Sequence, residues 1–263
     1  MTRKKLPCAL TIAGSDSGGG AGIQADLKTF AALRVHGTSA VTCLTAQNPE
    51  HVLSVHPAPP EIVRDQIRAV LAELSPAAIK TGMLYSARII KSVLEALRLT
   101  DVPLIVDPVM ISTSGAQLLR RDAVTAMREE LFPRAELVTP NLSELEFLLR
   151  TKIKTPEELR SAARELYAQY QCPVLAKGGH LRGREALDFF FDGRDELMLQ
   201  SPRIAGVSTH GTGCTYSAAI TAYRARGYAL AKAVAAAKDF ISQTISRSYR
   251  CGSHDVLGII PPK

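Results

Sequence analysis

Short apolar segments alternate with longer amphipathic segments from one end of this chain to the other. The apolar segments are rich in β-branched residues and carry few polar positions, which is typical of strands that are buried on both faces. The predicted strands are Ala9–Ala13, Ala40–Leu44, Ala78–Thr81, Leu104–Val106, Leu137–Thr139, Val174–Ala176 and Leu187–Phe191.

The segments between these strands repeat apolar side chains at the three- and four-residue spacing of a helix with one buried face. Thr155, Pro156 and Glu158 form the pattern of a capping box with proline at the first helical position. The stretch from Thr215 to about Ser248 is rich in small residues and predicts two helices separated near Gly227. The other predicted helices are Ile23–Leu33, Glu61–Leu74, Ser86–Leu97, Asp122–Leu131 and Pro156–Tyr170.

This alternation predicts an α/β fold in which a mostly parallel central sheet is covered by helices on both faces. The sequence contains no internal repeat, low-complexity tract or linker, so residues 1–263 are predicted to form a single domain. Hydrophobic residues make up 46% of the chain and charged residues 22%, which excludes a disordered or fibrous protein.

The chain carries 32 Lys and Arg residues against 25 Asp and Glu residues, a surplus of +7 that favours anionic partners. Aromatic residues make up only 5%, tryptophan is absent, and the basic residues are scattered rather than clustered. Small anions are therefore expected as ligands in preference to nucleic acid. No segment approaches the roughly 20 apolar residues of a membrane span, so no membrane contact is expected.

The cysteines are odd in number, widely spaced and without a Cys-x-x-Cys pair, which indicates neither disulfides nor a zinc site. We therefore expect a reducing, cytoplasmic location. Arg3, Lys4 and Lys5 before the apolar run Leu6–Ala13 resemble a signal peptide, but Pro7 interrupts the run. We therefore expect that this segment is not a signal peptide and that the protein is not exported.

A glycine-rich segment, Gly14–Gly22, stands between the first predicted strand and the first predicted helix. Its glycines allow a sharp turn and a close approach of the backbone to a ligand. It is neither a P-loop, which would need lysine at Gly20, nor a dinucleotide fingerprint, which would need a small residue at Ile23. A turn without a ligand is the alternative.

A second glycine-rich segment, Ser208–Ser217, opens a predicted helix with Gly211, Thr212 and Gly213. Backbone N–H groups and the positive end of the helix dipole predict an anion hole there for a phosphoryl group. Cys214 lies inside this turn, where the dipole is expected to favour the thiolate and give the residue a role as base or as donor. A packed thiol is the alternative for Cys214.

Polar residues also follow three predicted strands, where open α/β sheets place their ligands. Asp107 follows Leu104–Val106, Asn141 and Glu144 follow Leu137–Thr139, and Lys177 follows Val174–Ala176. Together these side chains are suited to holding Mg²⁺ and nucleotide phosphates. Individually, the acidic and amide residues could instead cap turns and helices, and Lys177 could be solvated.

With these motifs in place, the sequence resembles the ribokinase superfamily, and within it the hydroxymethylpyrimidine and phosphomethylpyrimidine kinases of thiamine biosynthesis. Many ribokinase relatives carry aspartate at the anion hole, whereas the vitamin-kinase branch carries cysteine, as this chain does at Cys214. The resemblance rests on Ala9–Phe30, Thr45–Asn48, Lys80–Met83, Val106–Met110, Thr139–Glu144, Lys177–His180 and His210–Thr215.

The resemblance implies a three-layer α/β/α ribokinase-like fold and a kinase that uses MgATP. The substrate would be 4-amino-5-hydroxymethyl-2-methylpyrimidine, phosphorylated to the monophosphate and then to the diphosphate. Gln47 would match the amino group and the adjacent ring nitrogen of the pyrimidine, and Met83 would pack on the ring. The implied pyrimidine pocket is lined by Gly14, Asp26, Gln47 and Met83.

For the nucleotide, the resemblance implies that Asp107 and Glu144 lie by Mg²⁺ and contact it through water, and that Lys177 holds phosphate charge. The implied nucleotide-binding residues are Asp107, Asn141, Glu144, Lys177 and Lys238, and the implied anion hole is Gly211, Thr212, Gly213 and Cys214. A monovalent cation and a homodimer are further expectations. The alternatives are a pyridoxine or pyridoxal kinase, and a catalytically silent binding module on the same fold.

Overall fold

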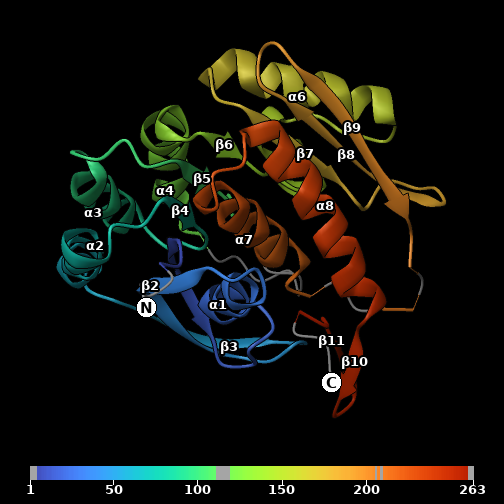
Figure 1. The fold of residues 1–263 in the computed structure, drawn as a ribbon. Helices are drawn as coiled ribbons and strands as arrows, with labels where there is room; N and C mark the ends of the chain where they lie inside the picture. The colour runs from blue at the N-terminus through green and yellow to red at the C-terminus, as the bar shows by residue number, and fades with distance from the viewer. Residues whose placement is uncertain (1–4, 111–118, 205, 208–209, 260–263) are drawn as a thin grey trace.

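The computed structural model describes residues 5–110, 119–204, 206–207 and 210–259. Strands and helices alternate along most of this length (Figure 1). The strands are β1 Cys8–Asp16, β2 His36–Gln47, β3 Val52–Pro57, β4 Ala78–Thr81, β5 Leu104–Val106, β6 Leu137–Val138, β7 Val174–Gly178, β8 Glu185–Phe191, β9 Glu196–Pro202, β10 Tyr249–Cys251 and β11 His254–Val256. The α-helices are α1 Gly22–Ala32, α2 Pro60–Leu74, α3 Ala87–Leu97, α4 Arg121–Ala126, α5 Leu142–Leu149, α6 Pro156–Tyr170, α7 Thr212–Ala225 and α8 Leu230–Ser246.

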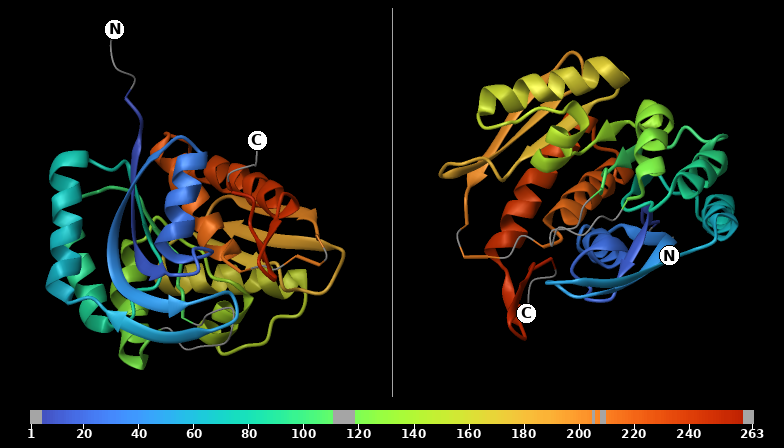
Figure 2. Two further views of the ribbon diagram at one scale, coloured as in Figure 1. Left: turned by 90° about the horizontal axis from the view of Figure 1, so that it is seen from below. Right: turned by 180° about the vertical axis from the view of Figure 1, so that it is seen from behind.

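A single large sheet runs through the molecule in the strand order β3-β2-β1-β4-β5-β6-β7-β8-β9. The strands from β2 to β7 in this order pair in parallel, and antiparallel pairing is confined to β3 at one edge and to β8 and β9 at the other. A separate hairpin of β10 and β11 projects beside the C-terminus (Figure 2). The predicted mostly parallel sheet is therefore confirmed.

Two helical layers cover the sheet and bury alternate residues of its central strands (Figures 1 and 2). On one face, α2 to α6 pack against side chains such as Ile79 and Val106. On the other face, α1, α7 and α8 pack against side chains such as Ala78 and Ile105. This explains why the central strands are apolar at successive positions, and it confirms the three-layer α/β/α fold.

Most of the elements missed by the hydrophobic pattern are strands at a sheet edge, and the short helix α5 was also missed. In β9, exposed and partly buried residues alternate, and in β3 the side chains of Ser54 and His56 are exposed. These strands bury little apolar surface, so a pattern based on strands buried on both faces does not detect them. The short β10–β11 hairpin was missed for the same reason.

The predicted helix Asp122–Leu131 is wrong in its second half. The chain forms α-helix only over α4 and then widens into a π-helix at Met127–Leu131, followed by a 3₁₀ turn at Phe132–Arg134. Met127, Leu131 and Phe132 are all fully buried. The wider turn lets these three side chains enter the core together, so tertiary packing overrides regular helical geometry here.

The parallel strands bring their carboxyl ends to one edge of the sheet, where Asp107 follows β5, Asn141 and Glu144 follow β6, and Lys177 lies at the end of β7. The two helices of the C-terminal region are confirmed, and the first of them, α7, begins at this same edge with Thr212. Among the described residues, no helix has both the length and the apolar character needed to cross a bilayer.

Candidate active site

The start of α7 is fixed by a close approach between the two glycine-rich segments. Gly211 precedes the helix with a φ of +79°, in the left-handed region that favours glycine. A Cβ atom at Gly211 would collide with the carbonyl oxygen of Gly20, and one at Gly20 would lie 2.8 Å from Cδ2 of His210. The sequence therefore needs glycine on both sides of this contact. Ser208 and Thr209, the first residues of the second segment, lie outside the described residues.

The amides of the first glycine-rich segment bind a carboxylate of the chain itself. Asp16 accepts hydrogen bonds from the backbone N–H groups of Gly18 at 2.8 Å, Gly20 at 3.1 Å and Ala21 at 2.8 Å. Burial alone would raise the pKa of Asp16, but the hydrogen bonds from His210 and from the loop amides outweigh it and lower that pKa. Asp16 thus shapes the loop, a role that the sequence analysis missed although Asp16 stands among its glycines.

A buried ion pair faces the first turn of α7. Lys177 donates to Oδ1 of Asp107 at 3.0 Å, Ser217 donates to Oδ2 of Asp107 at 3.2 Å, and Thr139 donates to Oδ1 at 3.2 Å. A Cβ at Gly213 would lie 3.3 Å from the Lys177 ammonium. Burial alone would raise the pKa of Asp107, but Lys177 above all holds it below its ordinary value. The predicted Asp107, Lys177 and Gly213 are therefore brought together.

Asn141 and Glu144 form a reciprocal capping box at the start of α5. The Asn141 side chain accepts from the Glu144 N–H at 3.0 Å, and the Glu144 carboxylate accepts from the Asn141 N–H at 2.8 Å. This matches the capping alternative, while contact of either residue with a nucleotide stays a prediction. The pKa of Glu144 is raised to about 8, mainly by burial and also by nearby Asp107, while Lys177 opposes the shift.

The Asp107 and Glu144 carboxyl groups fit the expected magnesium ion through their charge. Lys177 lowers the pKa of both groups, but burial and the charge of Asp107 still leave the pKa of Glu144 raised, so ionised Glu144 beside Asp107 would need additional positive charge. A divalent cation would supply that missing charge. Protein donors already bond both oxygens of Asp107 and Oε2 of Glu144, which favours contact through water molecules. The part of the chain that the structure describes holds no cluster of three or more His, Cys, Asp or Glu residues suited to a metal.

Cys214 lies in the first turn of α7, where it also receives a hydrogen bond from the backbone N–H of Gly22 at the start of α1. Burial nevertheless raises the pKa of its thiol to about 11. Asp26 and Asp107 add to this rise, and Lys80 opposes it. The expectation of a favoured thiolate is therefore wrong for the ligand-free protein, because the cost of desolvating the charged sulfur exceeds the stabilisation by the helix start.

Gly14 and Met83 meet in a small apolar cluster at the carboxyl end of β1. A Cβ at Gly14 would lie 2.7 Å from Sγ of Cys43 and 3.5 Å from Sδ of Met83. Gln47 ends β2 nearby, and its Oε1 accepts from Thr45 at 3.2 Å. Three of the four residues expected to line the pyrimidine pocket thus gather at one edge of the sheet, and their contact with a pyrimidine stays a prediction.

Asp26 and Lys238 differ from the expected picture because each is engaged in a buried ion pair. Asp26 is 0% exposed and pairs with Lys80 at 2.9 Å, so it does not line an open pocket. Lys238 donates to Asp188 at 2.7 Å and to the carbonyl of Ala186 at 2.9 Å, which holds α8 against β8. The approach of Lys238 to a nucleotide stays a prediction.

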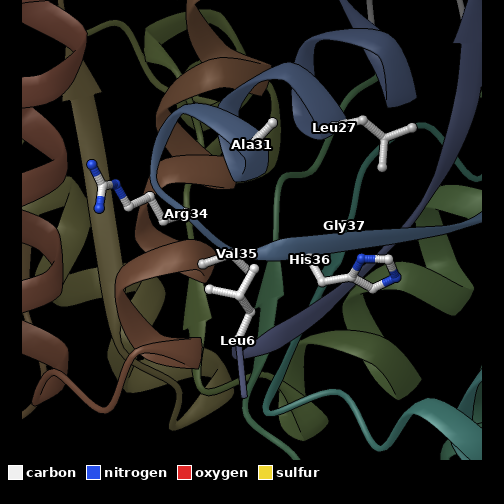
Figure 3. Close-up of a pocket in the computed structure, with 7 residues that line it drawn as sticks. All are labelled: Leu6, Leu27, Ala31, Arg34, Val35, His36 and Gly37. Carbon is white, nitrogen blue, oxygen red and sulfur yellow. The ribbon is translucent and has the colours of Figure 1, made fainter. Parts of the chain in front are cut away.

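A shallow groove lies away from this site, at the opposite end of the sheet (Figure 3). It is formed where α1 ends and β2 begins, and residues from Arg34 to Gly37 contribute much of its wall. None of the residues expected to carry chemistry lines it. The candidate site at the carboxyl ends of the strands is therefore identified from the contacts and charges of its residues and not from this groove.

Comparison with known proteins identifies the family of this chain. The family model described as phosphomethylpyrimidine kinase matches residues 16–258, nearly the whole chain. The chain belongs to this family. We therefore interpret the predicted anion hole, the Asp107–Lys177 pair and the apolar cluster of Gly14 and Met83 by comparison with phosphomethylpyrimidine kinases.

Individual relatives agree with this assignment. The hydroxymethylpyrimidine/phosphomethylpyrimidine kinase of Rhizobium meliloti is 48% identical over 243 residues, which cover 92% of this chain and 91% of the relative. The thiamine biosynthesis bifunctional protein ThiED of Geobacter sulfurreducens is 47% identical over 239 residues, 90% of this chain, and the chain spans only 48% of that longer protein.

The fold is also that of a solved vitamin kinase. An ADP complex of pyridoxal kinase from Bacillus subtilis superimposes with a TM-score of 0.88 at 36% sequence identity. The match covers 96% of this chain and 97% of the pyridoxal kinase. Phosphomethylpyrimidine kinases and pyridoxal kinase therefore share the ribokinase-like fold, and the fold alone does not separate their substrates.

We expect Gly211→Ala to reduce turnover by roughly a hundredfold, the size of effect seen when an anion-binding backbone group is displaced. The added methyl group meets the Gly20 carbonyl and must move the start of α7. Gly179→Ala is the matched control, because a Cβ there has no neighbour within 4 Å. Steady-state kinetics of both variants, with circular dichroism to verify folding, make the test. Equal loss in both variants would contradict this role of Gly211.

We expect the thermal stability of the protein to fall, relative to Glu144→Gln, as the pH rises from about 4.5 to about 8. With its pKa raised, folded Glu144 keeps a proton that the unfolded chain has already released, so unfolding is favoured as the pH increases. Glutamine keeps an acceptor for the capping box and does not titrate. Tm is measured against pH in the presence of a chelator.

Glu146→Gln on the same helix is the control with the opposite sign. Hydrogen bonds from the Ile153 backbone and the Lys152 side chain lower the pKa of Glu146, whose side chain is 20% exposed. Its small contribution to stability is present above the ordinary glutamate pKa and lost as the pH falls. Parallel Tm curves for the native chain and Glu144→Gln would show that Glu144 has no raised pKa.

Proposed function

We propose that this protein uses ATP to phosphorylate the 5-hydroxymethyl group of 4-amino-5-hydroxymethyl-2-methylpyrimidine. The same site would then phosphorylate the monophosphate to the diphosphate, for thiamine biosynthesis. The observation that carries the proposal is the close approach of Gly213, next to Cys214 in the first turn of α7, to the Asp107–Lys177 pair, in a chain that belongs to the phosphomethylpyrimidine kinase family. The names of the relatives from Rhizobium meliloti and Geobacter sulfurreducens support the substrate and the pathway.

The residues around the start of α7 would act mainly by holding and neutralising the phosphoryl group. Phosphoryl transfer asks for little covalent chemistry from the protein, so positioning and charge stabilisation dominate. The Gly211–Gly213 turn would place backbone N–H groups and the helix dipole towards the equatorial phosphate oxygens. Lys177, 10% exposed at its side chain, would add a positive charge from the opposite side.

Cys214 would lie between the alcohol and the transferred group. Because burial raises the pKa of its thiol to about 11, the residue enters as a neutral thiol. A neutral thiol donates a hydrogen bond to the substrate oxygen or to the phosphoryl group, whereas a base would have to lose its proton first. The ligand-free electrostatics therefore favour the donor role over the base role.

Asp107 and Glu144 would hold Mg²⁺ through water, and the ion would neutralise charge on the phosphates of ATP. Asn141 and Lys238 would assist nucleotide binding by shaping the surrounding elements rather than through free polar groups, since both are engaged in hydrogen bonds with the protein. A monovalent cation, a homodimer and a cytoplasmic location remain expectations from the family resemblance and from the cysteine pattern.

A second candidate is a pyridoxine or pyridoxal kinase, which the overlap with the Bacillus subtilis pyridoxal kinase favours. Incubation with ATP, Mg²⁺ and either the aminopyrimidine alcohol or pyridoxine, followed by mass spectrometry, separates the two. We expect the mono- and diphosphate of the aminopyrimidine. Preferential phosphorylation of pyridoxine would favour the second candidate, and tight pyrimidine binding without turnover would indicate a silent binding module.

We expect Cys214→Ala to lower kcat far more than it changes the affinity for the pyrimidine alcohol, because the thiol acts on the reacting atoms. Cys251→Ala is the matched control, since that cysteine is exposed in β10. Turnover is followed by a coupled assay of ADP release. A Cys214→Ala enzyme with native turnover would remove Cys214 from the mechanism.

A further inference from the structure

Lys80 is a charged side chain at the centre of the sheet. It lies on β4, between β1 and β5, in a strand whose residues are all buried, and it is 0% exposed. Its ammonium donates to Oδ2 of Asp26 at 2.9 Å, and Thr11 donates to the same oxygen at 2.6 Å. Thr11 and Lys80 are register partners on β1 and β4, so both reach Asp26 from one face of the sheet.

This face is the one that α1 and α7 cover (Figure 1). Asp26 comes from α1, and Ala78, two residues before Lys80, packs in the cluster formed with α7 and α8. Residues two apart in a strand point to the same side, so Lys80 points towards α1 and α7. The charge on Lys80 acts on Cys214 in the first turn of α7, and it also acts on Asp107.

Stability alone gives a weak reason for this ion pair. Burying two charges costs about as much as their attraction returns, and apolar side chains of similar size often replace such pairs without loss. In addition, Oδ1 of Asp26 is buried without a hydrogen-bond partner in the part of the chain that the structure describes. A pair that is costly and incompletely bonded, directly beneath a reactive turn, points to a functional constraint.

We propose that Lys80 is a positioning residue for Cys214. Asp26 and Thr11 fix its ammonium on the sheet face that α7 covers, where the positive charge stabilises the partial negative charge on sulfur when the Cys214 thiol donates a hydrogen bond, and the negative charge of the group transferred there. The inference deepens the proposed kinase function and rests on it for the identity of the transferred group. The electrostatic link between Lys80 and Cys214 is independent of the substrate.

The charged groups around Cys214 determine how it responds to substitution. Lys80 faces it from β4 and Lys177 from β7, whereas Asp26 from α1 and Asp107 from the end of β5 oppose the thiolate. Removal of Lys80 therefore destabilises a thiolate at Cys214, and removal of the Asp26 charge stabilises it. An ion pair too far from the thiol to act on its charge would give no such opposite effects, and the effect on kcat then tests whether this influence contributes to the reaction.

The test is the rate at which iodoacetamide alkylates Cys214, measured by peptide mass spectrometry between about pH 7.5 and pH 10. The Cys214 thiolate displaces iodide and forms a carbon–sulfur bond, so the rate at a fixed pH follows the thiolate fraction. We expect Lys80→Met to slow the reaction roughly tenfold and Asp26→Asn to accelerate it, as for a change of about one pKa unit in each direction. Cys251 in the same samples is the internal control, because it is exposed and outside this site.

Folding of each variant is checked by circular dichroism and a cooperative thermal transition. If the single variants do not fold, the double variant Lys80→Met/Asp26→Asn carries the test, because it leaves no unpaired charge. Lys80 acts more strongly on Cys214 than Asp26 does, so the double variant is also expected to react more slowly than the native chain. Native alkylation rates in the folded variants, or shifts of Lys80→Met and Asp26→Asn in the same direction, would overturn the proposal.

Turnover separates this inference from the proposed function. The double variant is expected to lose kcat with little change in KM for the pyrimidine alcohol, since neither residue lines an open pocket. If the native protein phosphorylates neither test alcohol, the proposed function fails while the alkylation result still decides the role of Lys80. If alkylation shifts as expected but kcat is unchanged, Lys80 does not contribute to the reaction and the proposal is overturned.

Discussion

The contact between the Gly211 backbone and the Gly20 carbonyl fixes the start of α7, and the rest of the site depends on that position. Asp16 shapes the Gly20 side of the contact by binding three loop amides, and the left-handed φ of Gly211 shapes the other side. Gly213 then lies against the Lys177 ammonium with no room for a side chain. Small shifts of this turn would separate the helix dipole from the Asp107–Lys177 pair, so both glycine-rich segments serve one geometric constraint.

Charge is balanced differently in the three buried lysine–aspartate pairs that the structure describes at this edge and beside it. Lys238 and Asp188 bond each other and neighbouring backbone groups, which joins α8 to β8. Lys177 and Asp107 share their environment with Glu144, where one lysine serves two carboxyl groups. Lys80 and Asp26 leave one carboxylate oxygen unbonded. The Lys238–Asp188 pair supports the fold, whereas the pair whose lysine also serves Glu144 and the pair with an unbonded carboxylate oxygen lie around the start of α7, where a charged ligand would alter the balance.

Much of this architecture could be predicted from the sequence, because buried parallel strands and amphipathic helices have strong periodic patterns. β4 and β5 have the predicted bounds, and the capping box at Thr155 and Glu158 is present. The edge strands β3 and β9 could not be predicted in this way, since half of their side chains face solvent. The π-helical turn after α4 depends on contacts with distant residues, which local pattern does not contain.

The residues of the candidate site likewise divide into those that could be predicted from the sequence and those that could not. Strand ends located Asp107 and Lys177, and the glycines located the start of α7, because backbone geometry restricts those positions. The ion-pair partners of Asp26 and Lys238 could not be inferred from the sequence, since each partner lies more than 45 residues away along the chain. Lys80 had a detectable signal, a charge within an otherwise apolar strand, but its meaning depends on which helix lies above it.

The state of Cys214 shows why motif and electrostatics have to be weighed together. A helix start stabilises a negative charge by about 0.3–1 kcal/mol at an exposed site. One pKa unit corresponds to about 1.4 kcal/mol, so burial that raises the thiol pKa to about 11 exceeds that contribution. The same backbone amides therefore do not produce a thiolate in the ligand-free protein. In the proposed function they receive a phosphoryl group, which arrives already charged and needs no ionisation of the protein, so the turn is better suited to receiving an anion than to creating one.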